Sequence, residues 1–161
     1  MTRRLIHVCA ALALSLLLVG CSTDPKAQAE KYLQSGDKYY KTGKYKEASI
    51  MYRRALQKDM RFGDAYYKLG LTELKLGKFV ESLRALQRAV ELQPKNMDAP
   101  VKLAEMYLTI YANDPKKSQN YIKEIEDLAK RLTDNNPNSY DGLRLKGYVA
   151  LTKQKPEEAL D

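Results

Sequence analysis

The sequence is poor in the side chains that most enzymes use. Among 161 residues it has no tryptophan, one histidine (His7) and two cysteines (Cys9 and Cys21). Histidine is the commonest general base near neutral pH, cysteine supplies thiolate nucleophiles, and both are frequent zinc ligands. Carboxylates and lysines are present, but no spacing of them indicates catalysis. We therefore expect no enzyme, and we name no catalytic residue, metal ligand or cofactor.

The one long apolar run lies at the amino terminus. Two arginines precede the run Val8–Val19, which only Ser15 interrupts. A transmembrane helix needs roughly 20 apolar residues, whereas a short run behind a positive start is typical of a secretory signal peptide. We predict a signal at residues 1–20. Its removal would take away the only histidine.

The run ends in Leu18-Val19-Gly20-Cys21, which resembles the bacterial lipobox. The resemblance implies that a diacylglyceryl group alkylates the Cys21 thiol before the signal is cut off. Several acyl chains would then hold the protein at a membrane, since one chain alone binds weakly. In the best-studied sorting systems an aspartate after the cysteine favours the inner membrane, and here Ser22 follows. We expect an outer-membrane lipoprotein that faces the periplasm; the alternative is an ordinary signal peptide that happens to contain a cysteine.

Residues 21–28 are small and polar and include a proline, which predicts a flexible lipidated tether. From residue 29 onward the chain repeats itself with a period of about 34 residues, the length of a tetratricopeptide repeat (TPR). Three pairs of small residues recur at that spacing: Gly36 and Gly70, Gly43 and Gly77, and Ala55 and Ala89.

The content of the repeats also resembles the tetratricopeptide family. The family's signature positions hold Tyr32, Gly36, Tyr39, Gly43, Tyr45, Ala48, Tyr52 and Ala55 in residues 29–62, and Tyr66, Leu69, Gly70, Gly77, Phe79, Ser82, Leu86, Ala89 and Pro94 in residues 63–96. Met60, Glu73 and Ser82 are mild departures. The resemblance implies an all-α fold of helix-turn-helix repeats, stacked as a right-handed TPR superhelix (an α-solenoid), with small residues where the two helices of a unit approach closely.

The third unit is enlarged and spans residues 97–139. Its closing proline, Pro137, lies about nine residues later than the period places it. We expect the surplus between Thr109 and Ser118, followed by a longer second helix.

A fourth unit, 140–161, stops before its second helix. Because repeat arrays need a polar cap over their last apolar face, we expect that the array 29–161 is the amino-terminal part of a longer array or of a multidomain protein.

In this family the first helices line an inner groove that usually binds peptides. Some members hold a carboxyl-terminal peptide through lysine and asparagine, but here those positions are Leu33, Asp37, Tyr67 and Leu71. We therefore expect a protein or peptide partner that contributes apolar anchors. For any single tyrosine, packing in the core is the competing interpretation. By position, the candidates are Leu33, Asp37, Tyr40, Tyr67, Leu71, Leu74, Glu105, Leu108 and Tyr148, together with Lys41, Lys75, Val101 and Arg144.

The chain is basic, with a pI near 9.3. Four lysines (Lys38, Lys41, Lys44 and Lys46) cluster early in the array. Near the tether they could touch anionic lipid, although a solvated helix surface is the preferred interpretation. No nucleic-acid motif is present, so we expect no nucleic-acid partner, and no small-molecule substrate is indicated.

These observations favour a membrane-anchored scaffold or adaptor that mediates protein–protein interactions in exopolysaccharide, secretion or envelope assembly. It resembles repeat lipoproteins of exopolysaccharide and protein-sorting systems. One alternative is a pilotin-like factor for pilus or secretin assembly. Another is the substrate-selecting arm of an enzyme whose catalytic domain lies beyond Asp161.

Overall fold

The computed structural model describes residues 24–116 and 118–153. The predicted signal at 1–20, the predicted lipidation site Cys21 and the end of the fourth unit lie outside the described residues. The described part forms seven helices, none of them both long enough and apolar enough to cross a membrane. Their bounds are α2 (Pro25–Lys41), α3 (Tyr45–Lys58), α4 (Gly63–Lys75), α5 (Phe79–Leu92), α6 (Asp98–Asn113), α7 (Gln119–Asn135) and α8 (Tyr140–Thr152).

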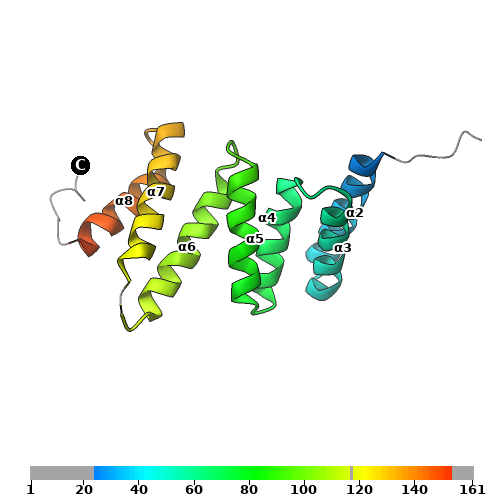
Figure 1. The fold of residues 1–161 in the computed structure, drawn as a ribbon, viewed down its shortest axis with the longest axis horizontal. Coiled ribbons are helices and arrows are strands. Elements are labelled where there is room, and N and C mark those ends of the chain that lie inside the picture. The colour runs from blue at the N-terminus through cyan, green and yellow to red at the C-terminus, as the bar shows by residue number, and fades with distance from the viewer. Residues whose placement is uncertain (1–23, 117, 154–161) are drawn as a thin grey trace, which may run out of the picture.

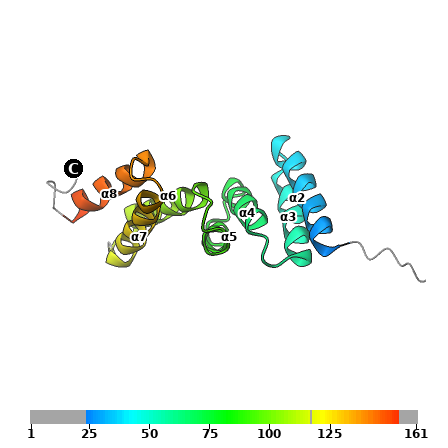
Figure 2. The same cartoon turned by 90° about the horizontal axis from the view of Figure 1, so that it is seen from above.

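Consecutive helices pair as hairpins. Helix α2 packs against α3, α4 against α5 and α6 against α7, and α8 packs against α7. Figure 1 shows the hairpins side by side along the long axis, with α2 and α3 at one end and α8 at the other. The view from above shows the same order (Figure 2). The predicted all-α fold of stacked helix-turn-helix units is confirmed.

The first helix begins earlier than the composition indicated. Asp24 caps it, because its Oδ1 accepts a hydrogen bond of 3.1 Å from the backbone N–H of Lys26. Pro25 occupies the first turn, where a missing N–H leaves no hydrogen bond unmade. The tether predicted at 21–28 is therefore wrong for residues 25–28, which are helical.

The turns within the first two hairpins share one geometry. Gly43 and Gly77 have φ angles of +73° and +72°, a region that glycine enters without steric cost. After α2, the N–H of Gly43 donates to the carbonyl of Tyr40 and the N–H of Lys44 to that of Tyr39, both at 3.0 Å. This pair of hydrogen bonds is the Schellman motif, which satisfies the last carbonyls of a helix. The recurring glycines are thus required by the turn.

Two other glycines lie where the helices of a hairpin touch. A Cβ on Gly36 would be 2.5 Å from Cε1 of Tyr52, and one on Gly70 would be 2.7 Å from Cγ of Leu86. Neither contact is possible in a packed interior. At the second crossing the Ser82 hydroxyl also donates to the Gly70 carbonyl at 2.8 Å. The expectation of small residues at close helix approaches is met at both sites.

The third hairpin is longer than the second. Helices α6 and α7 have 16 and 17 residues, compared with 13 and 14 in α4 and α5. Residues 114–118 connect them, and the Asp114 carboxylate accepts backbone N–H bonds of 2.9 Å from Lys116 and Ser118. Part of the surplus expected between Thr109 and Ser118 is therefore helical, because α6 continues to Asn113.

The buried apolar side chains form one large cluster and two small ones. The large cluster joins α5, α6, α7 and α8 around Leu86, Ile122 and Leu145. The small clusters join α2 and α3 to α4 and α5 around Tyr52 and Ala65. The first two hairpins therefore bury apolar side chains in clusters separate from the large one that joins the later helices.

Replacing Gly77 by alanine tests the turn geometry. We expect the free energy of unfolding to fall by about 1–2 kcal/mol, because a Cβ at positive φ crowds the following carbonyl. No atom beyond Gly77 and its two chain neighbours lies within 4 Å of that Cβ, so the loss comes from the local backbone alone. Urea unfolding followed by circular dichroism measures it. Gly77→Asn is the matched control and should recover part of the loss, because asparagine tolerates this region; an alanine variant as stable as the parent would refute the argument.

Candidate functional site

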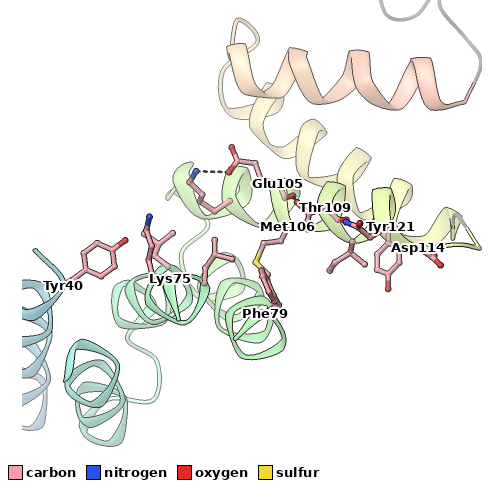
Figure 3. A pocket seen from close by; sticks show the side chains of 13 residues that line it. Tyr40, Lys75, Phe79, Glu105, Met106, Thr109, Asp114 and Tyr121 are labelled. Carbon is pink, nitrogen blue, oxygen red and sulfur yellow. Dashed lines mark hydrogen bonds and ion pairs between the residues drawn. The ribbon is translucent and has the colours of Figure 1, made fainter. Parts of the chain in front are cut away.

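A groove of about 910 Å³ opens between α4 and α6 (Figure 3). Tyr40 from α2 and Tyr121 from α7 stand at its ends, and Phe79 comes from the start of α5. The Phe79 side chain is 61% exposed, which is unusual for a large apolar group. The other lining residues are Leu71, Leu74, Lys75, Lys102, Glu105, Met106, Thr109, Ile110, Asn113 and Asp114.

The structure brings together only some of the residues that the sequence predicts for the groove. Tyr40, Leu71, Leu74 and Glu105, with Lys75, line the groove. Leu33 packs against the two small core clusters instead. The other four apolar or aromatic candidates pack partly buried against the large cluster: Tyr67, Val101, Leu108 and Tyr148.

Asp37, also a predicted groove residue, has a structural partner. It accepts a hydrogen bond of 2.7 Å from the Tyr52 hydroxyl, and the Lys68 ammonium lies 3.9 Å from it. Burial and this bond to Asp37 raise the pKa of Tyr52. The Asp37 carboxylate therefore joins α2 to α3 and α4 and does not line the groove.

Apart from Glu105, sequence reasoning missed the groove residues contributed by α6, and it missed those from the starts of α5 and α7. Phe79 occupies a signature position that the pattern assigns to packing, yet most of its side chain is exposed. Ile110 and Asn113 belong to the last turn of α6, which has no counterpart in the shorter α4. Only the irregular length of the third unit signalled this extension, because the 34-residue period itself has no place for it.

Ion pairs neutralise one side of the groove. The Lys102 ammonium lies 2.8 Å from Glu105 Oε2, and the Arg144 guanidinium lies 3.8 Å from Glu105 Oε1 and 3.1 Å from Asp141. Lys75, by contrast, forms no ion pair with any residue in 24–116 or 118–153. The groove thus presents an apolar floor beside a cation that no described residue pairs.

Tyr67 lies beside the groove on the same first-helix face. Burial raises its pKa, and the negative charges of Asp98 and Glu105 and the nearby Tyr40 add to the rise. Its hydroxyl therefore stays neutral at physiological pH and can donate a hydrogen bond.

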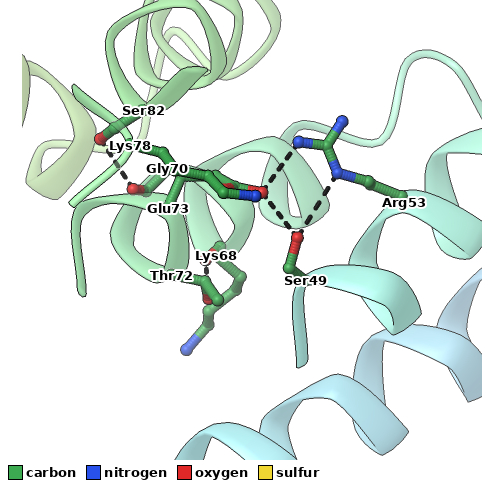
Figure 4. Close-up of polar contacts among 8 residues, drawn as sticks. All are labelled: Ser49, Arg53, Lys68, Gly70, Thr72, Glu73, Lys78 and Ser82. Carbon is green, nitrogen blue, oxygen red and sulfur yellow. Dashed lines mark hydrogen bonds and ion pairs between the residues drawn. The ribbon is translucent and has the colours of Figure 1, made fainter. Parts of the chain in front are cut away.

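A buried carboxylate joins the first two hairpins (Figure 4). Glu73 of α4 has no exposed surface, and its Oε1 accepts hydrogen bonds of 2.6 Å from Ser49 Oγ and 2.8 Å from Arg53 Nη2, both of α3. The Lys78 ammonium lies 3.7 Å from Oε2. Burial by itself would raise the pKa of Glu73, but the bonds from Ser49 and Arg53 and the charges of Arg53 and Lys78 bring it below its ordinary value. The carboxylate is therefore ionised and hydrogen-bonded at the junction between the first and second hairpins.

The four early lysines lie away from the start of the array. Lys38 and Lys41 are in the last turn of α2, and Lys44 and Lys46 flank the start of α3. Helix α2 has 17 residues, which at 1.5 Å per residue separates them from Asp24 by about 25 Å. The expectation that they lie near the tether is therefore wrong for the described residues.

Part of the chain matches known repeat sequences. Residues 36–77 match a family described as "TPR repeat", and residues 63–96 match one described as "Tetratricopeptide repeat". A peroxisomal targeting signal receptor of Komagataella phaffii is 29% identical over 117 residues, which cover 68% of this chain and 20% of the receptor. The rhomboid protease GluP of Bacillus subtilis is 30% identical over 98 residues, covering 60% of this chain and 19% of the protease. The chain thus spans about one fifth of the length of these relatives.

A solved structure supports the same relationship. YrrB is 28% identical, with a TM-score of 0.63 over 82% of this chain and 63% of its own. It is described as a TPR protein with an unusual peptide-binding site.

Replacing Glu73 by glutamine tests the buried carboxylate. We expect the free energy of unfolding at pH 7 to fall by about 1.5–3 kcal/mol, the range for hydrogen bonds to a charged group. Glu30→Gln, at an exposed position of α2, is the matched control and should change stability little.

The two variants should also differ in pH dependence. A lowered folded-state pKa gives stability that is present above the unfolded value, about 4.3, and is lost as pH falls through the folded value. Urea unfolding between pH 7 and pH 3 should therefore show a smaller decline for Glu73→Gln than for Glu30→Gln. Parallel curves would count against an ionised Glu73.

Proposed function

We propose that this chain, in which residues 36–77 and 63–96 match tetratricopeptide-repeat families, is a membrane-anchored, periplasm-facing scaffold that holds partner proteins in the groove between α4 and α6. The observation that carries the proposal is the apolar surface left exposed there. Contiguous apolar surface of this kind marks sites where proteins or ligands bind. The peptide-binding site named for the similar YrrB supports a peptide as the bound element.

The shape and position of the groove suit a peptide segment. Leu71 and Leu74 face it from α4, and Met106 and Ile110 from α6, so apolar side chains line both walls. Neither Leu71 nor Leu74 belongs to a core cluster of the described residues. Both leucines are partly exposed and line the groove, so part of each side chain is available to a partner.

The proposed location depends on the amino terminus. The resemblance of Leu18-Val19-Gly20-Cys21 to a lipobox supports a lipid anchor at Cys21, and Ser22 supports the outer membrane over the inner one. The scaffold would then act in exopolysaccharide, secretion or envelope assembly, as a binding protein without catalytic activity of its own.

A second candidate is that these repeats are the substrate-selecting arm of an enzyme. The similarity to the rhomboid protease GluP favours it, because that enzyme shares sequence with these repeats. Both candidates use the groove in the same way, so the groove experiment below serves either.

The groove is tested by replacing Leu71 and Leu74 together with alanine. We expect recovery of crosslinked partner proteins from envelope membranes to fall about tenfold, because two buried apolar anchors lose contact with the partner. The helical circular dichroism should not change. The matched control is Ile50→Ala with Leu143→Ala, which removes two exposed apolar side chains outside the groove and should leave recovery intact. Equal recovery with both double variants would mean that the groove is not the binding site.

The anchor is tested by Cys21→Ser. We expect metabolic labelling with a radioactive fatty acid to disappear, because serine has no thiol to be alkylated. Cys9→Ser lies within the predicted signal and serves as the control, with labelling preserved. Labelling that persists in Cys21→Ser would exclude the lipobox interpretation.

A further inference from the structure

We propose that the groove selects peptide segments in which an acidic side chain lies next to the apolar anchors, and that Lys75 is the residue that recognises the acid. The inference rests on the proposed function, because it names the class of partner that the same groove takes. It differs from capture of a carboxyl terminus, since the recognised carboxylate belongs to a side chain within the segment.

The first argument is the charge state of the groove. Glu105 is held by Lys102 and Arg144, so it repels an incoming carboxylate little. The two carboxylate oxygens of Asp114 accept hydrogen bonds from the backbone N–H groups of Lys116 and Ser118, just before α7. Lys75 has no such partner among the described residues, and its side chain is exposed. A bound carboxylate would supply the missing charge partner.

The second argument is the position of Lys75 relative to the apolar floor. Leu74 and Lys75 lie three and four residues after Leu71 on α4, the spacings that place side chains on one face of a helix, and all three line the groove. Figure 3 shows the Lys75 ammonium pointing away from α4, between Tyr40 and the side chains of α6. A peptide whose apolar side chain rests on Leu71 therefore brings its neighbouring residue within reach of Lys75.

Two further lysines lie close to Tyr40 and Lys75 in the sequence. Lys41 follows Tyr40 directly in α2 and is exposed, and it forms no ion pair within the described chain. The Lys78 ammonium, in the turn after α4, lies 3.7 Å from Glu73 Oε2 and so already has a charge partner. A basic segment would be repelled by Lys75 here, whereas an acidic one meets complementary charge.

The apolar part of the groove is adaptable. Met106 lies among its lining residues, and an unbranched thioether fits side chains of different shapes. Phe79 offers an exposed aromatic ring beside it. We therefore expect the apolar anchors to vary between partners while the acidic neighbour is retained.

The experiment uses the full chain purified in detergent and a library of random peptides of about 12 residues, displayed on phage with no free carboxyl terminus. Selection is run in parallel on the parent, on Lys75→Glu and on the Leu71→Ala, Leu74→Ala double variant. We expect the parent to enrich peptides that combine apolar residues with aspartate or glutamate. Lys75→Glu should lose this acidic bias and favour lysine or arginine instead.

A selected peptide then gives the affinity by fluorescence anisotropy. We expect Lys75→Met to weaken it about fivefold, the upper range for an exposed ion pair, and the same loss when the acidic residue of the peptide becomes its amide. Lys58→Met, which removes one exposed lysine at the end of α3, is the matched control and should bind like the parent.

The outcomes separate this inference from the function on which it rests. Selected peptides that require Leu71 and Leu74 but carry no acidic bias would overturn the role of Lys75 and leave the groove as the binding site. Enrichment on the parent no greater than on the double variant would contradict both. An acidic bias that Lys75→Glu does not change would also overturn the assignment to Lys75.

Discussion

The close contact between the two helices of each unit is the constraint on which the described structure depends. At Gly36 and Gly70 the partner helix comes so near that one added methyl group would overlap Tyr52 or Leu86. Such packing is possible only if the turn brings the second helix back at once, which Gly43 and Gly77 permit through their positive φ angles. The hairpin is therefore one closely packed unit, and the array is built by placing such units side by side.

Because each hairpin is a packed unit, the contacts between neighbouring hairpins decide where a partner can bind. Between the first and second hairpins two small apolar clusters are buried, and Glu73 adds a buried ionic link to α3. Between the second and third hairpins the side chains do not fill the space, and the groove lies there. Neighbouring residues of one helix thus serve different purposes: Glu73 holds the array together, while Leu74 and Lys75 face the groove.

The groove residues show how far a repeat pattern can predict a site. The resemblance to the tetratricopeptide family predicts Tyr40, Leu71, Leu74, Lys75 and Glu105, because the first helices of that family line an inner groove. It does not predict Ile110, Asn113 and Tyr121, because they reach the groove only through the longer helices of the third hairpin. Asp37 is placed in the groove by the same register, yet the Tyr52 hydroxyl draws it into a hydrogen bond between helices.

The sequence by itself determined the helical fold, the hairpin units and their glycine turns, because each depends on contacts within one repeat that recur at a fixed spacing. Only the tertiary structure decided that Glu73 is buried with partners from α3, that Phe79 stays exposed and that Lys75 lacks an ion pair within the described residues. The physical reason is that burial and pairing depend on side chains from two or three different hairpins. The lengths of α6 and α7 set where those side chains meet, and the period of a single repeat does not contain that information.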